Sequence, residues 1–75
     1  MKNKENISNF VFEFFKKQHS VKLLNKKIRE IKTFDSLSRF ALILYCTKKK
    51  IKVEFQDIEK SKNISELIEI IKKKN

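Results

Sequence analysis

The sequence predicts an all-α protein, a bundle of three to four helices in which a long loop joins the first helix to the second. Apolar residues recur at helical spacings of three and four positions in three separate segments. The chain contains no glycine and no proline, which the turns of a β-sandwich or barrel would need. Hydrophobic residues make up 40% of the chain, which argues against disorder, and 75 residues suit a single domain spanning residues 1–75.

The first helix is expected over residues 6–17. One face of it is apolar and comprises Ile7, Phe10, Val11 and Phe14. Lysines end this segment, where positive charge favours the helix dipole. Residues 18–34 have no regular apolar period. We therefore expect a long loop there, with apolar side chains dipping into the core and one short helical turn.

The second helix is expected to begin at Asp35-Ser36. The Asp35 carboxylate suits the N-cap, because it accepts a free backbone N–H of the first turn. The following apolar stripe comprises Leu37, Phe40, Ala41, Leu44 and Tyr45. We expect this stripe to form the core face, with Phe40, Leu44 and Tyr45 packed on the first and last helices. A run of three lysines at 48–50 closes the helix.

Two further elements follow. Residues 51–55 alternate apolar and charged side chains, but a single strand would have no partner, so we expect an extended loop. Residues 56–60 suit one short helix. The last helix begins after Asn63, which forms a capping box with Glu66. Its apolar face comprises Ile64, Leu67, Ile68 and Ile71.

The net charge of +10 admits a nucleic-acid or anionic-membrane partner. However, the chain is rich in Lys, Asn, Ile and Phe together, a composition typical of an AT-rich genome. Only Arg29 and Arg39 are arginines, the residue preferred for bidentate contacts with bases. We therefore favour compositional drift, and expect no nucleic-acid partner.

Few residues suggest catalysis or metal binding. Cys46 is the only cysteine and His19 the only histidine, so we expect no disulfide, no metal site and no catalytic dyad, with Cys46 a small buried side chain. No signal peptide or membrane-spanning run is visible. The expectation is a cytoplasmic monomer that is not an enzyme and does not insert into a membrane.

The segment Phe34-Asp35-Ser36-Leu37 and the apolar run after it resemble the acyl carrier protein family, which includes peptidyl and D-alanyl carriers. Ile51-Lys52-Val53 is similar to the segment that follows the family's second helix, and Asn63-Ile64-Ser65-Glu66 falls where its last helix begins. The resemblance spans nearly the whole chain. The tripeptide Asp-Ser-Leu is a weak motif by itself, and serine after aspartate is common at helix starts.

The resemblance implies an acyl-carrier-like bundle whose Ser36 bears a covalent 4′-phosphopantetheine arm. Its thiol would carry an acyl or aminoacyl group as a thioester between partner enzymes, after a phosphopantetheinyl transferase has attached the arm. Asp35 and Leu37 are expected to support the site by capping the helix and anchoring its first turn. A phosphodiester at a helix N-terminus is also favoured by the helix dipole and free N–H groups.

The second helix departs from the family's pattern in charge. Fatty-acid carriers present an acidic second helix, whereas this one offers Arg39, Lys48 and Lys49. We expect these residues to bind acyl-loading and acyl-transferring partners dedicated to this carrier, since like charges suppress association. Two alternatives remain open: a small basic helical nucleic-acid-binding protein, and an amphipathic membrane-surface protein suggested by the Phe-rich first helix.

Overall fold

The computed structural model describes residues 4–75, with side chains from residue 6 onward. Its elements are α1 (Lys4–His19), a 3-10 turn η1 (Ile28–Glu30), α2 (Ser36–Thr47), α3 (Phe55–Lys60) and α4 (Ile64–Lys74). No β-strand occurs over this range, apart from one isolated bridge between Lys27 and Asn63. The all-α class is confirmed, as are the long loop with one helical turn and the short helix near residues 56–60.

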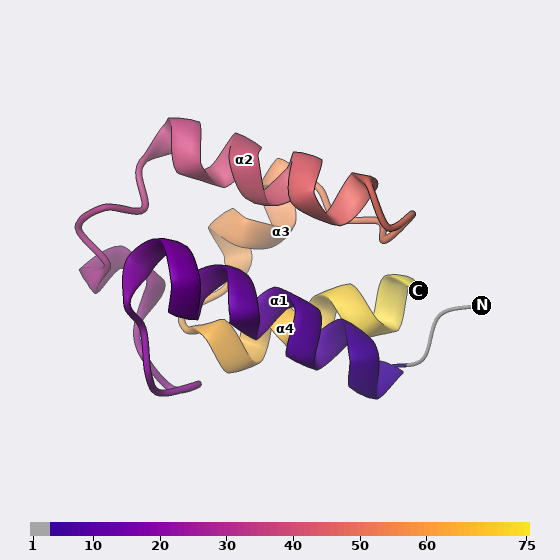
Figure 1. Cartoon of the computed structure of the whole chain (residues 1–75), viewed down its shortest axis with the longest axis horizontal. Coiled ribbons are helices and arrows are strands. Elements are labelled where there is room, and N and C mark those ends of the chain that lie inside the picture. The colour runs from indigo at the N-terminus through magenta and orange to yellow at the C-terminus, as the bar shows by residue number, and fades with distance from the viewer. Residues whose placement is uncertain (1–3) are drawn as a thin grey trace.

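The core lies where α1 packs along α4 (Figure 1). Helix α2 also packs against α1, and the short α3 contacts both α2 and α4. All four residues of the predicted α4 face are buried, and α1 contributes four large side chains. These core residues are Ile7, Val11, Phe14, Phe15, Ile64, Leu67, Ile68 and Ile71. The apolar period of the last helix therefore predicts its core face correctly. That of the first helix predicts three of the four core residues, since Phe10 is only partly buried and Phe15 is buried in addition.

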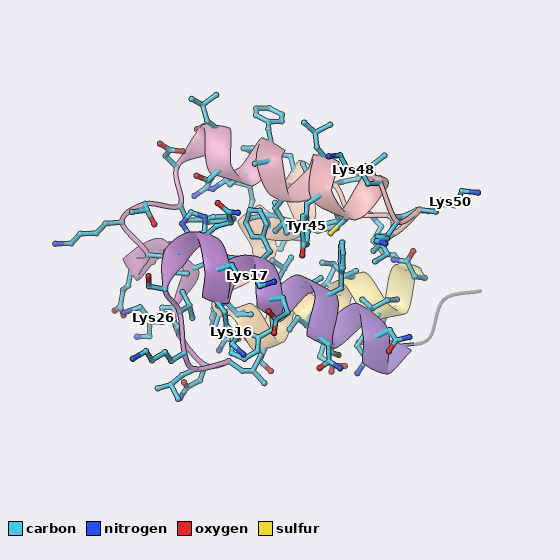
Figure 2. The ribbon with its side chains drawn as sticks, viewed as in Figure 1. Lys16, Lys17, Lys26, Tyr45, Lys48 and Lys50 are labelled. Atoms are coloured by element: carbon cyan, nitrogen blue, oxygen red, sulfur yellow. The ribbon has the colours of Figure 1, made fainter. Side chains whose placement is uncertain are left out.

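The core face predicted for α2 is wrong. Leu37, Phe40 and Leu44 are 78%, 54% and 64% exposed, whereas Leu42 and Cys46 are fully buried. A helix that is apolar nearly all round carries no periodic signal that says which side faces inward. Figure 2 shows Tyr45 turned from α2 toward α1, where its ring stacks on that of Phe10 at 4.1 Å. Of the three residues expected in the core, only Tyr45 is partly buried against it.

The long loop is tied to the start of α4. Ile28 N–H donates to the Lys62 carbonyl at 3.0 Å, and Ser65 N–H donates to the Leu24 carbonyl at 2.8 Å. Val21, Ile28, Ile31 and Phe34 of the loop are buried. These contacts fix the path of the loop and therefore the position at which α2 begins.

The helix caps follow the predicted residues closely. The Asn63 side chain accepts the Glu66 N–H at 2.8 Å, which confirms the N-cap of α4. The Glu66 carboxylate accepts the N–H of Lys62, one residue earlier than in the expected capping box. Because the chain has no glycine, Ser20 after α1 and Lys50 after α2 take the left-handed conformation that glycine usually provides, with φ of 55° and 59°.

Candidate functional site

The best candidate site is the first turn of α2. Asp35 has an extended backbone, and its Oδ1 accepts the Ser38 N–H at 3.0 Å, so it is the N-cap that the sequence predicts. This bond holds the pKa of the Asp35 carboxyl below its ordinary value. The cap fixes the residue at which the helix begins and therefore fixes Ser36 as its first residue.

The two serines of this turn have different environments. The Ser38 hydroxyl donates to the Thr33 carbonyl at 2.9 Å and helps to hold the loop against the helix. The Ser36 side chain is exposed. An exposed hydroxyl at this position lies at the positive end of the helix dipole, where a negative substituent is stabilised.

Leu37 does not anchor the turn, which corrects the role expected for it. Its side chain is the most exposed large apolar residue of the described chain. Leu37, Phe40 and Leu44 instead form an apolar strip along the outer side of α2, beginning beside Ser36. The ring of Phe40, within this strip, also contacts the ring of Phe55 of α3, with 5.3 Å between the ring centroids.

The basic residues expected to meet partners are separated in space. Lys48 and Lys49 are exposed at the far end of α2, and Figure 2 shows where Lys48 lies. Arg39 turns toward α3 instead, where its guanidinium pairs with the Glu59 carboxylate. Glu59 is a residue that sequence reasoning missed, because no local pattern links positions 20 residues apart.

A contact between His19 and Thr33, which the sequence did not predict, supports the first turn of α2 from the side of α1. His19 Nδ1 lies 2.5 Å from Thr33 Oγ1, and the His19 ring meets the Phe34 ring edge-on at 5.3 Å between centroids. A groove of about 690 Å³ runs from here along α2, between α1 and the apolar strip. Burial lowers the pKa of His19 below its ordinary value, and the negative charge of Asp35 partly opposes this shift.

We expect the His19 titration to report on this arrangement. Its pKa should lie below 6.5, and Asp35→Asn should lower it further because the opposing charge is removed. Folding then favours the neutral ring, so this contribution to stability is fully present above pH 6.5 and is lost as the pH falls from 6.5 through the lower pKa of the folded state. Proton NMR of the ring measures the pKa. Glu69→Gln, on α4, is the control; a raised pKa in Asp35→Asn would contradict the geometry.

Cys46 is a buried structural side chain, as predicted. It is fully buried, and desolvation raises the pKa of its thiol to about 12. A rise from 9.0 to about 12 reduces the thiolate fraction about a thousandfold. We therefore expect alkylation by iodoacetamide to be slow in the native protein and fast in denaturing urea. Mass spectrometry follows the alkylation over time. Rapid alkylation of the native protein would contradict the burial of Cys46.

No family model, curated protein or solved structure matches the chain. None of the helices in residues 4–75 is both long enough and apolar enough to span a bilayer. The same residues bring together no group of three or more His, Cys, Asp or Glu side chains that could hold a metal ion. The function must therefore be argued from the site itself.

Proposed function

We propose that the protein is an acyl carrier, whose Ser36 bears a 4′-phosphopantetheine arm. The observation that carries the proposal is the exposed Ser36 hydroxyl at the first position of a helix capped by Asp35. When bound, the arm would supply a thiol that holds an acyl or aminoacyl group as a thioester. The order of elements supports an acyl-carrier fold: a helix, a long loop, a capped helix, a short helix and a final helix.

The residues of the first turn fit a phosphodiester. Ser36 would hold it through the hydroxyl oxygen, at the positive end of α2, in a protein of net charge +10. Asp35 already accepts the Ser38 N–H, so it keeps the helix start in place when Ser36 is esterified. Asp35 is also exposed, and its carboxylate would be accessible to a metal ion held by the transferase.

The outer side of α2 is suited to partner enzymes. Leu37, Phe40 and Leu44 are exposed there, and an apolar strip on a small protein is a common feature of protein interaction sites. Lys48 and Lys49 lie beyond the strip and would steer an acidic partner surface by charge. Arg39, by contrast, is partly withdrawn by its pairing with Glu59. We therefore assign partner binding to the apolar strip together with Lys48 and Lys49. We place the carrier in the cytoplasm.

The proposal is tested by loading. Purified protein is incubated with coenzyme A, Mg²⁺ and a broad-specificity phosphopantetheinyl transferase, and its intact mass is measured. We expect a single adduct of the mass of one phosphopantetheine group. If broad-specificity transferases and transferases from basic-carrier systems all leave the mass unchanged, the proposal fails. The nucleic-acid alternative remains a prediction that a salt-dependent DNA-binding assay would test.

A further inference from the structure

A second candidate site lies on the other side of α2 from the groove near His19. A pocket of about 510 Å³ opens between η1, the first half of α2, the second half of α3 and the segment that joins α3 to α4. Its lining residues are Lys27, Ile28, Arg29, Arg39, Ile58, Glu59, Lys60, Ser61 and Lys62. Five of the nine are basic, although basic residues are only about a quarter of the chain, 19 of 75. The pocket is thus richer in positive charge than the composition explains.

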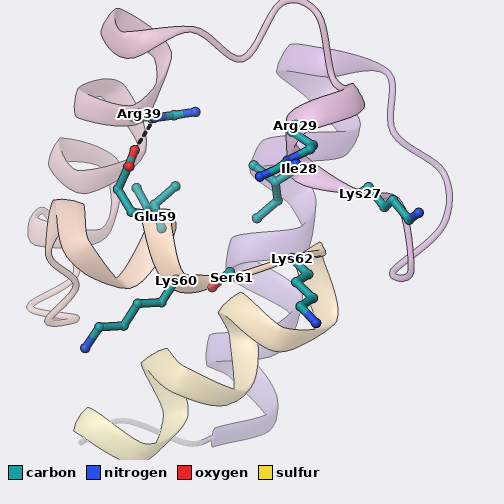
Figure 3. A pocket seen from close by; sticks show the side chains of 9 residues that line it. Lys27, Ile28, Arg29, Arg39, Glu59, Lys60, Ser61 and Lys62 are labelled. Atoms are coloured by element: carbon teal, nitrogen blue, oxygen red, sulfur yellow. Dashed lines mark hydrogen bonds and ion pairs between the residues drawn. The ribbon is translucent and has the colours of Figure 1, made fainter.

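Both arginines of the protein line this pocket, although they come from different elements. Figure 3 shows Arg29 reaching from η1 and Arg39 from α2 toward the space between these elements, whereas Lys27, Lys60 and Lys62 point away. The three lysines therefore contribute positive potential more than contacts. A guanidinium is a rigid fork of donors that matches the oxygens of phosphate and carboxylate, which a lysine ammonium does not.

The Arg39 side chain is held in place before any ligand binds. Its guanidinium carbon lies 6.0 Å from the centre of the Phe34 ring and 5.8 Å from that of Phe55, and Glu59 pairs with one terminal nitrogen. Its Nε–H is buried and has no hydrogen-bond partner among the residues that the structure describes. A fixed side chain loses little entropy on binding, and an unpaired buried donor favours an arrangement that supplies an acceptor.

Arg29 provides the second half of the site. It is exposed, and no carboxylate of residues 6–75 forms an ion pair with it. Glu59 is the only acidic residue that lines the pocket. The buried side chains of Ile28 and Ile58 supply an apolar wall beside the charges. This combination suits a small ligand with a charged end and a short aliphatic part.

We propose that Arg29 and Arg39 bind the phosphate monoester of a small molecule in this pocket. A dianion gains more than a monoanion from two arginines that reach into the pocket and from the positive potential of three nearby lysines, and only Arg39 among these five is already paired within the pocket. The ligand has two possible sources: a free metabolite, or the end of a cargo tethered at Ser36. Arg39 is three residues after Ser36, about 4.5 Å along the helix axis, so a tether reaches the pocket. The second source rests on the proposed carrier function, and the first does not.

The first experiment uses the protein without an arm and glycerol 3-phosphate as the probe, with glycerol as the uncharged control at the same ionic strength. We expect backbone amide shifts at Ile28 and Ser61 in NMR spectra, with the phosphate ester alone. Arg29→Gln should weaken binding at least about tenfold, and Arg29→Lys should restore only part of it, because the charge returns without the fork. Glu59→Gln should strengthen binding, because it removes the competing negative charge and keeps a side-chain oxygen that accepts a hydrogen bond from Arg39.

Lys73→Gln is the matched control, since it removes one charge from an exposed site at the end of α4. If Lys73→Gln weakens binding as much as Arg29→Gln, general charge attraction explains the result and the proposal is overturned. The proposal is also overturned if the shifts lie outside the pocket, or if neither compound causes any shift. Arg29 is exposed, so its variants are expected to fold, and the dispersion of the amide spectrum checks this.

The second experiment separates the two sources. Ser36→Ala should leave the affinity for free glycerol 3-phosphate unchanged. Arm-loaded protein is then charged with a phosphate-terminated acyl group or an uncharged acyl group of equal length. Shifts at Ile28 and Ser61 with the phosphorylated cargo alone identify the tethered source; shifts with the free ester alone identify a metabolite. If Ser36 cannot be loaded but the free ester still binds at Arg29, the carrier function fails and the phosphate site stands.

Discussion

Replacing Ser36 with alanine is expected to abolish loading by a phosphopantetheinyl transferase while leaving the fold intact. The transferred group needs a hydroxyl, and alanine removes it. Stability should change by less than about 0.5 kcal/mol, since the side chain is exposed and Asp35 still caps the helix through Ser38. Intact mass after incubation measures the loading, and urea denaturation measures the stability.

Ser38→Ala is the matched control for this experiment. Ser38 lies in the same turn, but its hydroxyl is engaged with the Thr33 carbonyl. We expect this variant to load normally and to lose about 1 kcal/mol of stability with its hydrogen bond. An adduct that persists in Ser36→Ala, or that disappears only in Ser38→Ala, would place the attachment elsewhere and contradict the proposed site.

The second large effect concerns the two sides of α2. Leu42 is fully buried and Leu44, two residues later, is 64% exposed. Leu42→Ala should lower the free energy of unfolding by about 2–5 kcal/mol, because it deletes core packing and leaves a cavity. Leu44→Ala should change it by less than about 0.5 kcal/mol. The comparison is well matched, since both variants make the same substitution in the same helix.

A loss of this size approaches the total stability of so small a domain, about 3–5 kcal/mol. Leu42→Ala is therefore expected to be largely unfolded by circular dichroism, and Leu42→Met provides a milder test, at less than about 1.5 kcal/mol. Leu44→Met should have no measurable effect in the same urea titration. Equal losses at positions 42 and 44 would mean that α2 is rotated about its axis relative to the orientation described above.

Several features could be predicted from residues close together in the sequence. The start of α2 follows from the short carboxylate of Asp35, and the start of α4 follows from Asn63, because capping involves neighbours only. The core face of α4 follows from one clear apolar stripe with lysines and glutamates opposite. The burial of Cys46 was expected from its residue type. The two caps depend on interactions within about one helical turn, and the other two features follow from an apolar period and a residue type that can be read along the chain.

The orientation of α2 and the position of Arg39 could not be predicted in this way. Leu37, Phe40 and Leu44 match the helical period as well as Leu42 and Cys46 do, so hydrophobicity does not distinguish the covered side from the open side. Arg39 was expected on a partner-binding surface, but Phe34 of the preceding loop and Phe55 and Glu59 of α3 surround it. These contacts form only when the helices are packed.

Neighbouring residues along the chain specify which segments are helical, where α2 and α4 begin, and that Ser36 is the first residue of α2. The exposed side of α2 and the pocket that Arg29 and Arg39 share are set by how the helices pack together. The physical reason is that burial and charge clustering depend on packing between segments distant in sequence, and a helix that is apolar on all sides can satisfy that packing in more than one orientation.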